Sequence, residues 1–228
     1  MARRSKRSKP LSPLEVRLCV GKSELSLAPQ CGGAVTRWLL GGVHIFRPCP
    51  APVFDPLDSG CFVLAPFSNV VEGGGFRFGG KFFPLQQNHR REPLPIHGDA
   101  WLAAWRLEKL SDGHATLSYD HNARRGFPLR YRVLQRIVLE PTRLTIALRL
   151  TNLDRAAMPA GLGLHPYFSR PEGSTLLAPH RGRWTPDRQV ADERFCRPER
   201  IRAPLTCASA AGREPRVFSG PGVGRIFR

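Results

Sequence analysis

Residues 130–140, RYRVLQRIVLE, and residues 143–151, RLTIALRLT, decide the fold. Both segments are rich in Val, Leu and Ile and contain neither Gly nor Pro. Runs of this kind are typical of β-strands, and the dipeptide Pro141-Thr142 between them is suited to a turn. The sequence therefore predicts two long strands that pair across this turn.

Shorter strand pairs of the same kind precede this hairpin. In each pair two apolar runs flank a short turn segment, such as Gly41-Gly42 or Gly79-Gly80, which suits the positive φ values of a tight turn. No long segment has a helical period. The chain is therefore predicted to be an all-β protein, a large antiparallel β-sandwich with at least nine strands before residue 152. The upstream pairs comprise residues 14–20 with 24–28, 34–40 with 43–46, 76–78 with 81–83, and 105–110 with 115–119.

The charge of the chain is strongly positive, with 35 Lys and Arg against 18 Asp and Glu among 228 residues. Part of the excess lies in the first ten residues, MARRSKRSKP, and we expect residues 1–12 to be a disordered basic tail because they are too polar to form a core. Residues 13–228 are then expected to form one domain. The remaining arginines are scattered singly, so no specific nucleic-acid partner is expected, although general attraction to phosphate-rich surfaces stays open.

The cysteines and the apolar runs bear on metal binding and on location. The six cysteines show neither a C-x-x-C pair nor a spacing typical of zinc ligands, so we expect free thiols and no metal. No apolar run approaches the roughly 20 residues of a membrane-spanning helix. Charges interrupt the apolar part that a signal peptide would need, and a cytoplasmic, reducing location follows as the expectation. The cysteines are Cys19, Cys31, Cys49, Cys61, Cys196 and Cys207.

Three short segments carry the candidate functional residues, each at the end of a predicted strand. They are PFSN at residues 66–69, IHGD at residues 96–99 and GLHPYF at residues 163–168. Together they supply two imidazoles, a primary amide and several aromatic rings. This mixture suits recognition of hydroxyl groups arrayed around an apolar ring.

Each candidate also has a plain structural alternative. His165 could be a buried ring with both nitrogens satisfied, and His97 could be a turn residue before a glycine. Asn69 could serve a turn or bulge, because its amide readily bonds the local backbone. Tyr167 and Trp101 are core aromatics by default. Both interpretations stay open from the residues alone.

The order of these segments resembles the aldose 1-epimerase (galactose mutarotase) family. The resemblance runs from about residue 14 to residue 228, and HG-x-x-W followed by LHPYF is the most specific combination. It implies a β-supersandwich whose open cleft holds an aldohexose. It also implies that His165 is the general acid that protonates the ring oxygen, with His97, Asn69, Trp101 and Tyr167 binding the sugar. No metal or cofactor is implied. The segments that carry it are residues 23–48, 66–69, 73–83, 96–105 and 151–168.

Two departures from the family pattern bear on activity. Val70 follows Asn69 where the family usually has an arginine, and the catalytic glutamate of the family has no counterpart near Pro215, although Glu214 is its neighbour. We therefore expect a truncated or altered C-terminus, an open sheet edge, and low stability or association with another chain. The leading hypothesis is a mutarotase-like enzyme with weakened activity. A non-catalytic carbohydrate-binding or sensing module is the alternative.

Overall fold

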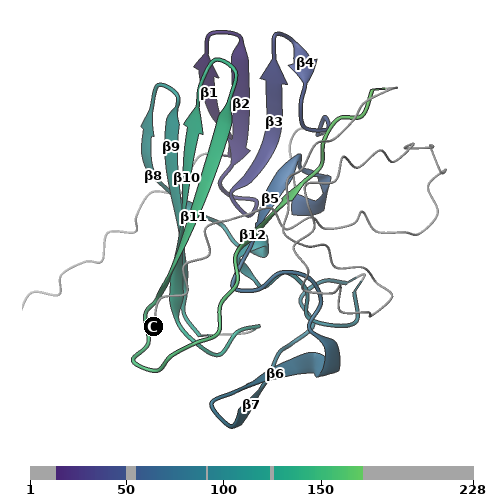
Figure 1. Cartoon of the computed structure of the whole chain (residues 1–228), viewed down its shortest axis with the longest axis vertical. Helices are drawn as coiled ribbons and strands as arrows, with labels where there is room; N and C mark the ends of the chain where they lie inside the picture. Colours follow the sequence, from purple (N-terminus) through teal and green to yellow (C-terminus); the bar gives the residue numbers. More distant parts are fainter. Residues whose placement is uncertain (1–13, 50–54, 91, 124–125, 172–228) are drawn as a thin grey trace, which may run out of the picture.

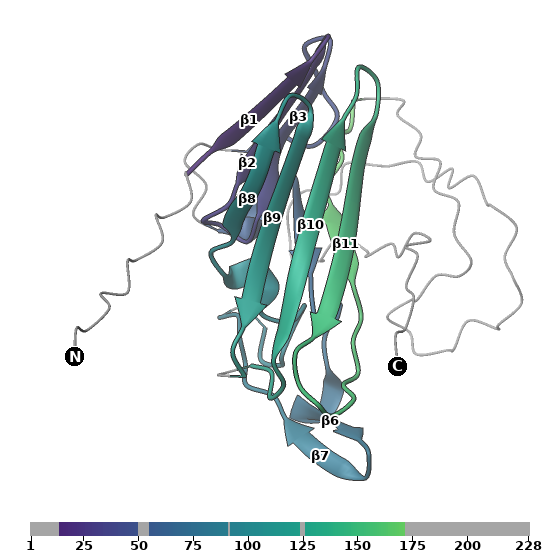
Figure 2. The same ribbon diagram turned by 90° about the vertical axis from the view of Figure 1, so that its left-hand side faces the viewer.

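A computed structural model describes residues 14–49, 55–90, 92–123 and 126–171. The described residues form two antiparallel sheets that stack as a sandwich, with a separate two-stranded hairpin at one end (Figure 1). The first sheet has the order β1-β2-β3-β5-β12, and β4 pairs with β3. The second has the order β11-β10-β9-β8 and faces the viewer in Figure 2. The large antiparallel β-sandwich predicted from the sequence is confirmed.

The elements of the first sheet are β1 (Val16–Val20), β2 (Ser23–Ala28), β3 (Ala34–Leu40), β4 (Val43–His44), β5 (Cys61–Leu64) and β12 (Gly163–Pro166). Those of the second sheet are β8 (Arg106–Ser111), β9 (His114–His121), β10 (Tyr131–Leu139) and β11 (Leu144–Asn152). The hairpin comprises β6 (Gly75–Phe78) and β7 (Lys81–Pro84). Three short 3₁₀ turns complete the described part: η1 (Pro56–Asp58), η2 (Glu72–Gly74) and η3 (Ala100–Leu102).

The core lies between the two sheets, and β10 shows why. Tyr131, Val133 and Ile137 are fully buried, whereas Arg132 and Arg136 between them are exposed. This alternation places one face of β10 on the core, where it joins buried leucines of β1 and β2. Burial of these apolar side chains is the main force that holds the sheets together.

All five predicted strand pairs are present, with ends shifted by a few residues. The bounds of β5 were not among the predicted strand pairs, because all four of its residues are buried and therefore do not alternate. It lies between β3 and β12 in the first sheet, with both faces covered. Such a strand has no polar face from which its period can be recognised.

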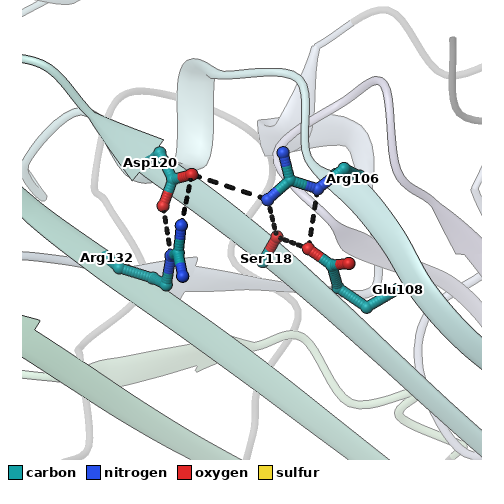
Figure 3. Close-up of polar contacts among 5 residues, drawn as sticks. All are labelled: Arg106, Glu108, Ser118, Asp120 and Arg132. Carbon is teal, nitrogen blue, oxygen red and sulfur yellow. Dashed lines mark hydrogen bonds and ion pairs between the residues drawn. The ribbon is translucent and has the colours of Figure 1, made fainter. Parts of the chain in front are cut away.

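The outer face of the second sheet is polar, as the network in Figure 3 shows. Arg132 contacts Asp120 at 2.9 Å, and Arg106 contacts Glu108 at 2.6 Å. Ser118 donates to Glu108 and accepts from Arg106, and Arg106 joins the two pairs through a contact with Asp120 at 3.5 Å. The hydrogen bond from Arg132 is the main cause of a lowered Asp120 pKa, and Arg106 adds to it. These side chains are partly solvated, so this face is an ordinary polar surface.

The strand β11 lies at one edge of the second sheet. Within the described ranges β11 pairs only with β10, and its core-facing side chains are half-buried, unlike their partners on β10. The expected association with another chain stays a prediction.

None of the helices in the described ranges has the length and apolar character needed to cross a membrane. The expected basic tail lies outside the described residues, as do Cys196, Cys207 and Glu214.

Candidate functional site

His97 and His165 come together from separate elements. His165 lies in β12, and His97 lies in a loop that forms a bridge to the residue following β5. Their ring centroids are 5.4 Å apart and the rings are nearly perpendicular, at 74°. Both are largely buried, with 4% and 7% of their surface exposed. The two histidines therefore converge as a largely buried pair.

The turn around His97 has an unusual backbone that is fixed by hydrogen bonds. His97 has φ of 61°, a left-handed conformation that few side chains adopt. Its main-chain N–H donates to the carbonyl of Asn69 at 3.0 Å, and the N–H of Asn69 donates to Nδ1 of His97 at 3.0 Å. Because Nδ1 accepts a hydrogen bond, the proton of the neutral ring lies on Nε2. The Nε2 atom of His97 is thus a hydrogen-bond donor.

Asn88 and Gly98 hold the same turn from outside. The side chain of Asn88 donates to the carbonyls of Ile96 and Gly98, and its Oδ1 accepts from the N–H of Ile96 at 2.9 Å. Trp101 donates from Nε1 to the carbonyl of Gly98 at 2.9 Å. Gly98 has φ of 69°, and a Cβ there would lie 1.9 Å from the carbonyl oxygen of Ala65. The HG pair of the sequence motif therefore has a structural reason: only glycine fits at the position that follows His97.

His165 is placed by the strand register and by a stacked aromatic ring. In the β12–β5 pairing it is opposite Phe62, and the two rings are stacked at 4.8 Å with 10° between their planes. Its Nδ1 atom is buried and has no hydrogen-bond partner among the described residues. Buried polar atoms are normally paired in native proteins. A ligand hydroxyl or a water molecule would satisfy this nitrogen.

Aromatic side chains surround the two imidazoles. Phe62 stacks on Trp101 at 5.4 Å, and Trp101 meets His97 edge to face at 6.0 Å. Tyr167 lies 4.7 Å from His165, and the guanidinium of Arg47 lies 3.6 Å above the Tyr167 ring. Aromatic faces next to hydrogen-bonding groups suit a sugar ring, which has apolar C–H faces and polar edges.

Burial lowers the pKa of both histidines below the usual 6.5. The pKa of His97 falls to about 3, mainly through burial, with smaller contributions from His165 and His89. The pKa of His165 falls to about 4, again mainly through burial. A contact with its own main-chain oxygen raises the pKa and so opposes this shift, and the charge of Arg47 lowers it slightly further. Both rings are therefore neutral near pH 7. They can donate and accept hydrogen bonds, but few molecules carry the extra proton that a strong general acid needs.

The other three predicted residues differ in their placement. Asn69 is exposed with φ of 65°, and its main chain, not its amide, makes the contacts to His97. Trp101 is 1% exposed, so in the described structure it packs beneath the site and supports Gly98. Tyr167 is half-buried beside His165. Val70 forms a bridge to Ile96 and leaves no guanidinium at that position.

Sequence reasoning missed Phe62, Asn88 and Arg47. The apolar run CFVL immediately before PFSN is a signal that would have indicated a buried strand at Phe62. Asn88 and Arg47 lie in loops, where no periodicity reveals which side chains turn toward a site.

A separate cavity of about 370 Å³ lies nearby, and neither His97 nor His165 lines it. Its lining residues are Gln30, Cys31, Asp55, Pro56, Asn88, His89, Arg90 and Leu102.

The fold and the paired histidines define a galactose mutarotase-like β-sandwich protein. The architecture is shared with a crystal structure of a proposed aldose 1-epimerase from Escherichia coli K12, with a TM-score of 0.68 and 30% identity over 81% of this chain and 60% of that one. It is also shared with the Slr1438 protein from Synechocystis sp. PCC 6803, with a TM-score of 0.62 and 29% identity over 79% of this chain and 63% of that one.

The sequence itself gives the family. Residues 16–199 match the family model of aldose 1-epimerase, and the chain belongs to the aldose 1-epimerase family. It is 35% identical over 139 residues to the uncharacterized protein YphB of Escherichia coli K12, a match that covers 61% of this chain and 47% of YphB. A second relative, the uncharacterized protein YihR of the same organism, is 26% identical over 141 residues, or 60% of this chain and 45% of YihR. The chain thus spans less than half the length of these two curated relatives.

Proposed function

We propose that the chain binds the pyranose ring of an aldohexose at the His97–His165 pair and interconverts its α and β anomers. The observation that carries this proposal is the approach of two neutral imidazoles to 5.4 Å, from separate elements and among aromatic rings. Membership of the aldose 1-epimerase family supports the same chemistry. The reaction needs no metal or cofactor, and we expect it to occur in the cytoplasm.

The reaction requires proton transfer at two oxygens. One group delivers a proton to the ring oxygen while another removes the proton from the anomeric hydroxyl; rotation about the C1–C2 bond and reclosure then give the other anomer. His165, whose Nδ1 is unpaired among the described residues, is the candidate for exchange with the ring oxygen. His97 is the candidate for donating from Nε2 to a sugar hydroxyl. Solvent water is the candidate acceptor for the proton of the anomeric hydroxyl, because Nδ1 of His97 already accepts a hydrogen bond.

A second candidate function is a non-catalytic carbohydrate-binding or sensing module. The lowered pKa of His165, about 4, favours it, because only about one molecule in a thousand then carries a cationic His165 at pH 7. A general acid contributes typically ~10²- to 10⁴-fold to a rate, so this shortage removes much of the advantage. Sugar binding through neutral hydrogen bonds is unaffected.

Anomer exchange measured by NMR or polarimetry separates the two functions. Freshly dissolved α-D-glucose and α-D-galactose would be followed near pH 7 in a buffer without imidazole, with wild-type protein, His165→Asn and the matched control His114→Asn. His114 is an exposed histidine at the start of β9, in the second sheet. Acceleration over buffer by wild type and His114→Asn, but not by His165→Asn, supports the enzyme. Sugar binding without acceleration selects the module. If the protein shows neither sugar binding nor acceleration of anomer exchange, the proposal is overturned.

A further inference from the structure

A second buried cluster, formed by His121, Asp99 and two tyrosines, lies next to the turn that carries His97. Asp99, two positions after His97, directs its carboxylate toward β9 and β10 of the second sheet. We propose that Asp99 is a positioning residue: it forms a buried ion pair with a protonated His121 and thereby fixes the His97 turn on the second sheet. Its consequence for sugar binding rests on the function proposed above, whereas the ion pair itself does not.

The carboxylate of Asp99 accepts contacts from three side chains. Tyr119 donates from its hydroxyl to Oδ2 at 2.6 Å, and Tyr131 donates to Oδ1. Nδ1 of His121 lies 2.5 Å from Oδ2. Charge-assisted contacts of this kind are shorter and stronger than neutral hydrogen bonds. Asp99 thus joins the first sheet, through its turn, to two strands of the second.

The partners of His121 determine its protonation state. Its Nε2 lies 2.7 Å from the carbonyl oxygen of Phe127, which can only accept a hydrogen bond. Its Nδ1 faces Asp99, whose carboxylate already accepts from two tyrosine hydroxyls. The Tyr119 hydroxyl also lies 3.3 Å from Nδ1, but it donates to the nearer Oδ2 of Asp99. Both ring nitrogens therefore carry hydrogen, and His121 is an imidazolium. The His121 ring is 2% exposed and stacked on Tyr131 at 4.8 Å, and the Asp99 side chain is 17% exposed, so the ion pair is largely shielded from water.

Electrostatics agree with this geometry. Burial alone would lower the pKa of His121, but the hydrogen bond and charge of Asp99, helped by the Phe127 carbonyl, outweigh burial and raise it. The titratable groups that face His121 from the described elements are Asp99, Tyr119 and Tyr131. Burial first, and then the charge of Asp99, raises the pKa of both tyrosines above the usual range, so they remain protonated donors.

The turn connects the Asp99–His121 ion pair to His97, so the ion pair restrains the position of His97. The N–H of Asp99 donates to the carbonyl of Ala65 at 3.1 Å, the same carbonyl that Gly98 approaches closely. The backbone from His97 to Asp99 is thus held between β5 on one side and the carboxylate contacts on the other. Loss of the carboxylate contacts releases one side of a short, strained segment.

The experiment compares Asp99→Asn with wild type and with His114→Asn, which alters an exposed histidine on the same strand as His121. Nitrogen-15 NMR of the imidazoles reports protonation, and amide hydrogen exchange at Asp99 reports the rigidity of the turn. In wild type we expect a doubly protonated His121 at pH 7, while Asp99→Asn returns it to the neutral form. Exchange at residue 99 and the dissociation constant for aldohexose should each rise at least about tenfold, because a hydrogen-bonded charge is lost. The control should change neither.

A neutral His121 in wild type at pH 7 would overturn the proposal, as would unchanged exchange at residue 99 in Asp99→Asn. If Asp99→Asn does not fold, Tyr119→Phe removes one donor to the carboxylate without a large change in shape, and slower or unchanged exchange there would overturn the proposal. Failure of wild type to bind any aldohexose would refute the proposed function alone. The imidazole spectra and the exchange rates would still decide the role of Asp99.

Discussion

The two buried histidine clusters of this protein share one turn, in which His97 and Asp99 are two residues apart, and they differ in charge. His97 and His165 are surrounded by aromatic rings, and burial lowers their pKa values to about 3 and about 4. His121 is buried to a similar degree but faces Asp99, and its pKa is raised. Burial sets the direction of the shift only where no carboxylate opposes it. The neutral pair suits a ligand with hydroxyl groups, and the charged pair suits a fixed connection between the sheets.

The largest expected effect comes from removing the ring that covers the neutral pair. Phe62→Ala deletes a fully buried aromatic side chain, which should lower the free energy of unfolding by ~3–5 kcal/mol in urea denaturation. The pKa values of His97 and His165 should rise toward 6.5 as water enters, while His121 should be unaffected. Phe82→Ala, at a side chain that is 49% exposed, is the control and should cost far less. Equal losses for the two variants would contradict the placement of Phe62.

Glycine substitution tests the turn between the two clusters. Gly98→Ala and Gly79→Ala both place alanine at positive φ, 69° and 56°, which costs roughly 1–2 kcal/mol in each case. Only at Gly98 does the new Cβ also meet backbone, whereas nothing lies within 4 Å of it at Gly79. Thermal unfolding should therefore show a clearly larger loss of stability for Gly98→Ala. Similar melting temperatures for the two variants would show that the Ala65–Gly98 approach is not tight.

The dependence of stability on pH should separate the clusters. A lowered pKa means that the neutral form is favoured on folding, so the contribution of His165 is complete above pH ~6.5 and is lost as the pH falls toward about 4. A raised pKa means the reverse: the contribution of His121 is complete below pH ~6.5 and is lost as the pH rises through its folded value. Denaturation of His165→Asn should show a flatter acid side than wild type, and His121→Asn a flatter alkaline side. The same change of slope in both variants would remove the distinction.

The smallest effect is expected on the outer face of the second sheet. Arg132→Gln breaks the contact with Asp120 in Figure 3, but both side chains are partly solvated. The free energy of unfolding should change by no more than ~1 kcal/mol, and less in high salt. Neither histidine cluster should respond in imidazole NMR spectra. A loss of several kcal/mol would show that this network has a structural role.

Much of the fold was predictable because its hairpins carry their own signals. The pairs around Gly41-Gly42 and Gly79-Gly80, and the long pair β10–β11, follow from apolar runs separated by turn residues. The strand β5 did not, because burial on both faces removes alternation. At the site, His97 and His165 were found through motif order. The ion pair of Asp99 with His121 was not, since no local pattern shows that two strands and a turn will bring these side chains together.

The central claim is that the neutral pair, and not the charged cluster, receives the sugar. Nitrogen-15 imidazole spectra recorded at pH 7 during a titration with D-glucose or D-galactose test it most directly. We predict that His97 and His165 are neutral and that their resonances shift in a saturable manner, while His121 stays doubly protonated and unmoved. Saturable shifts confined to His121 or to exposed histidines, or no saturable shift with either sugar, would contradict the account.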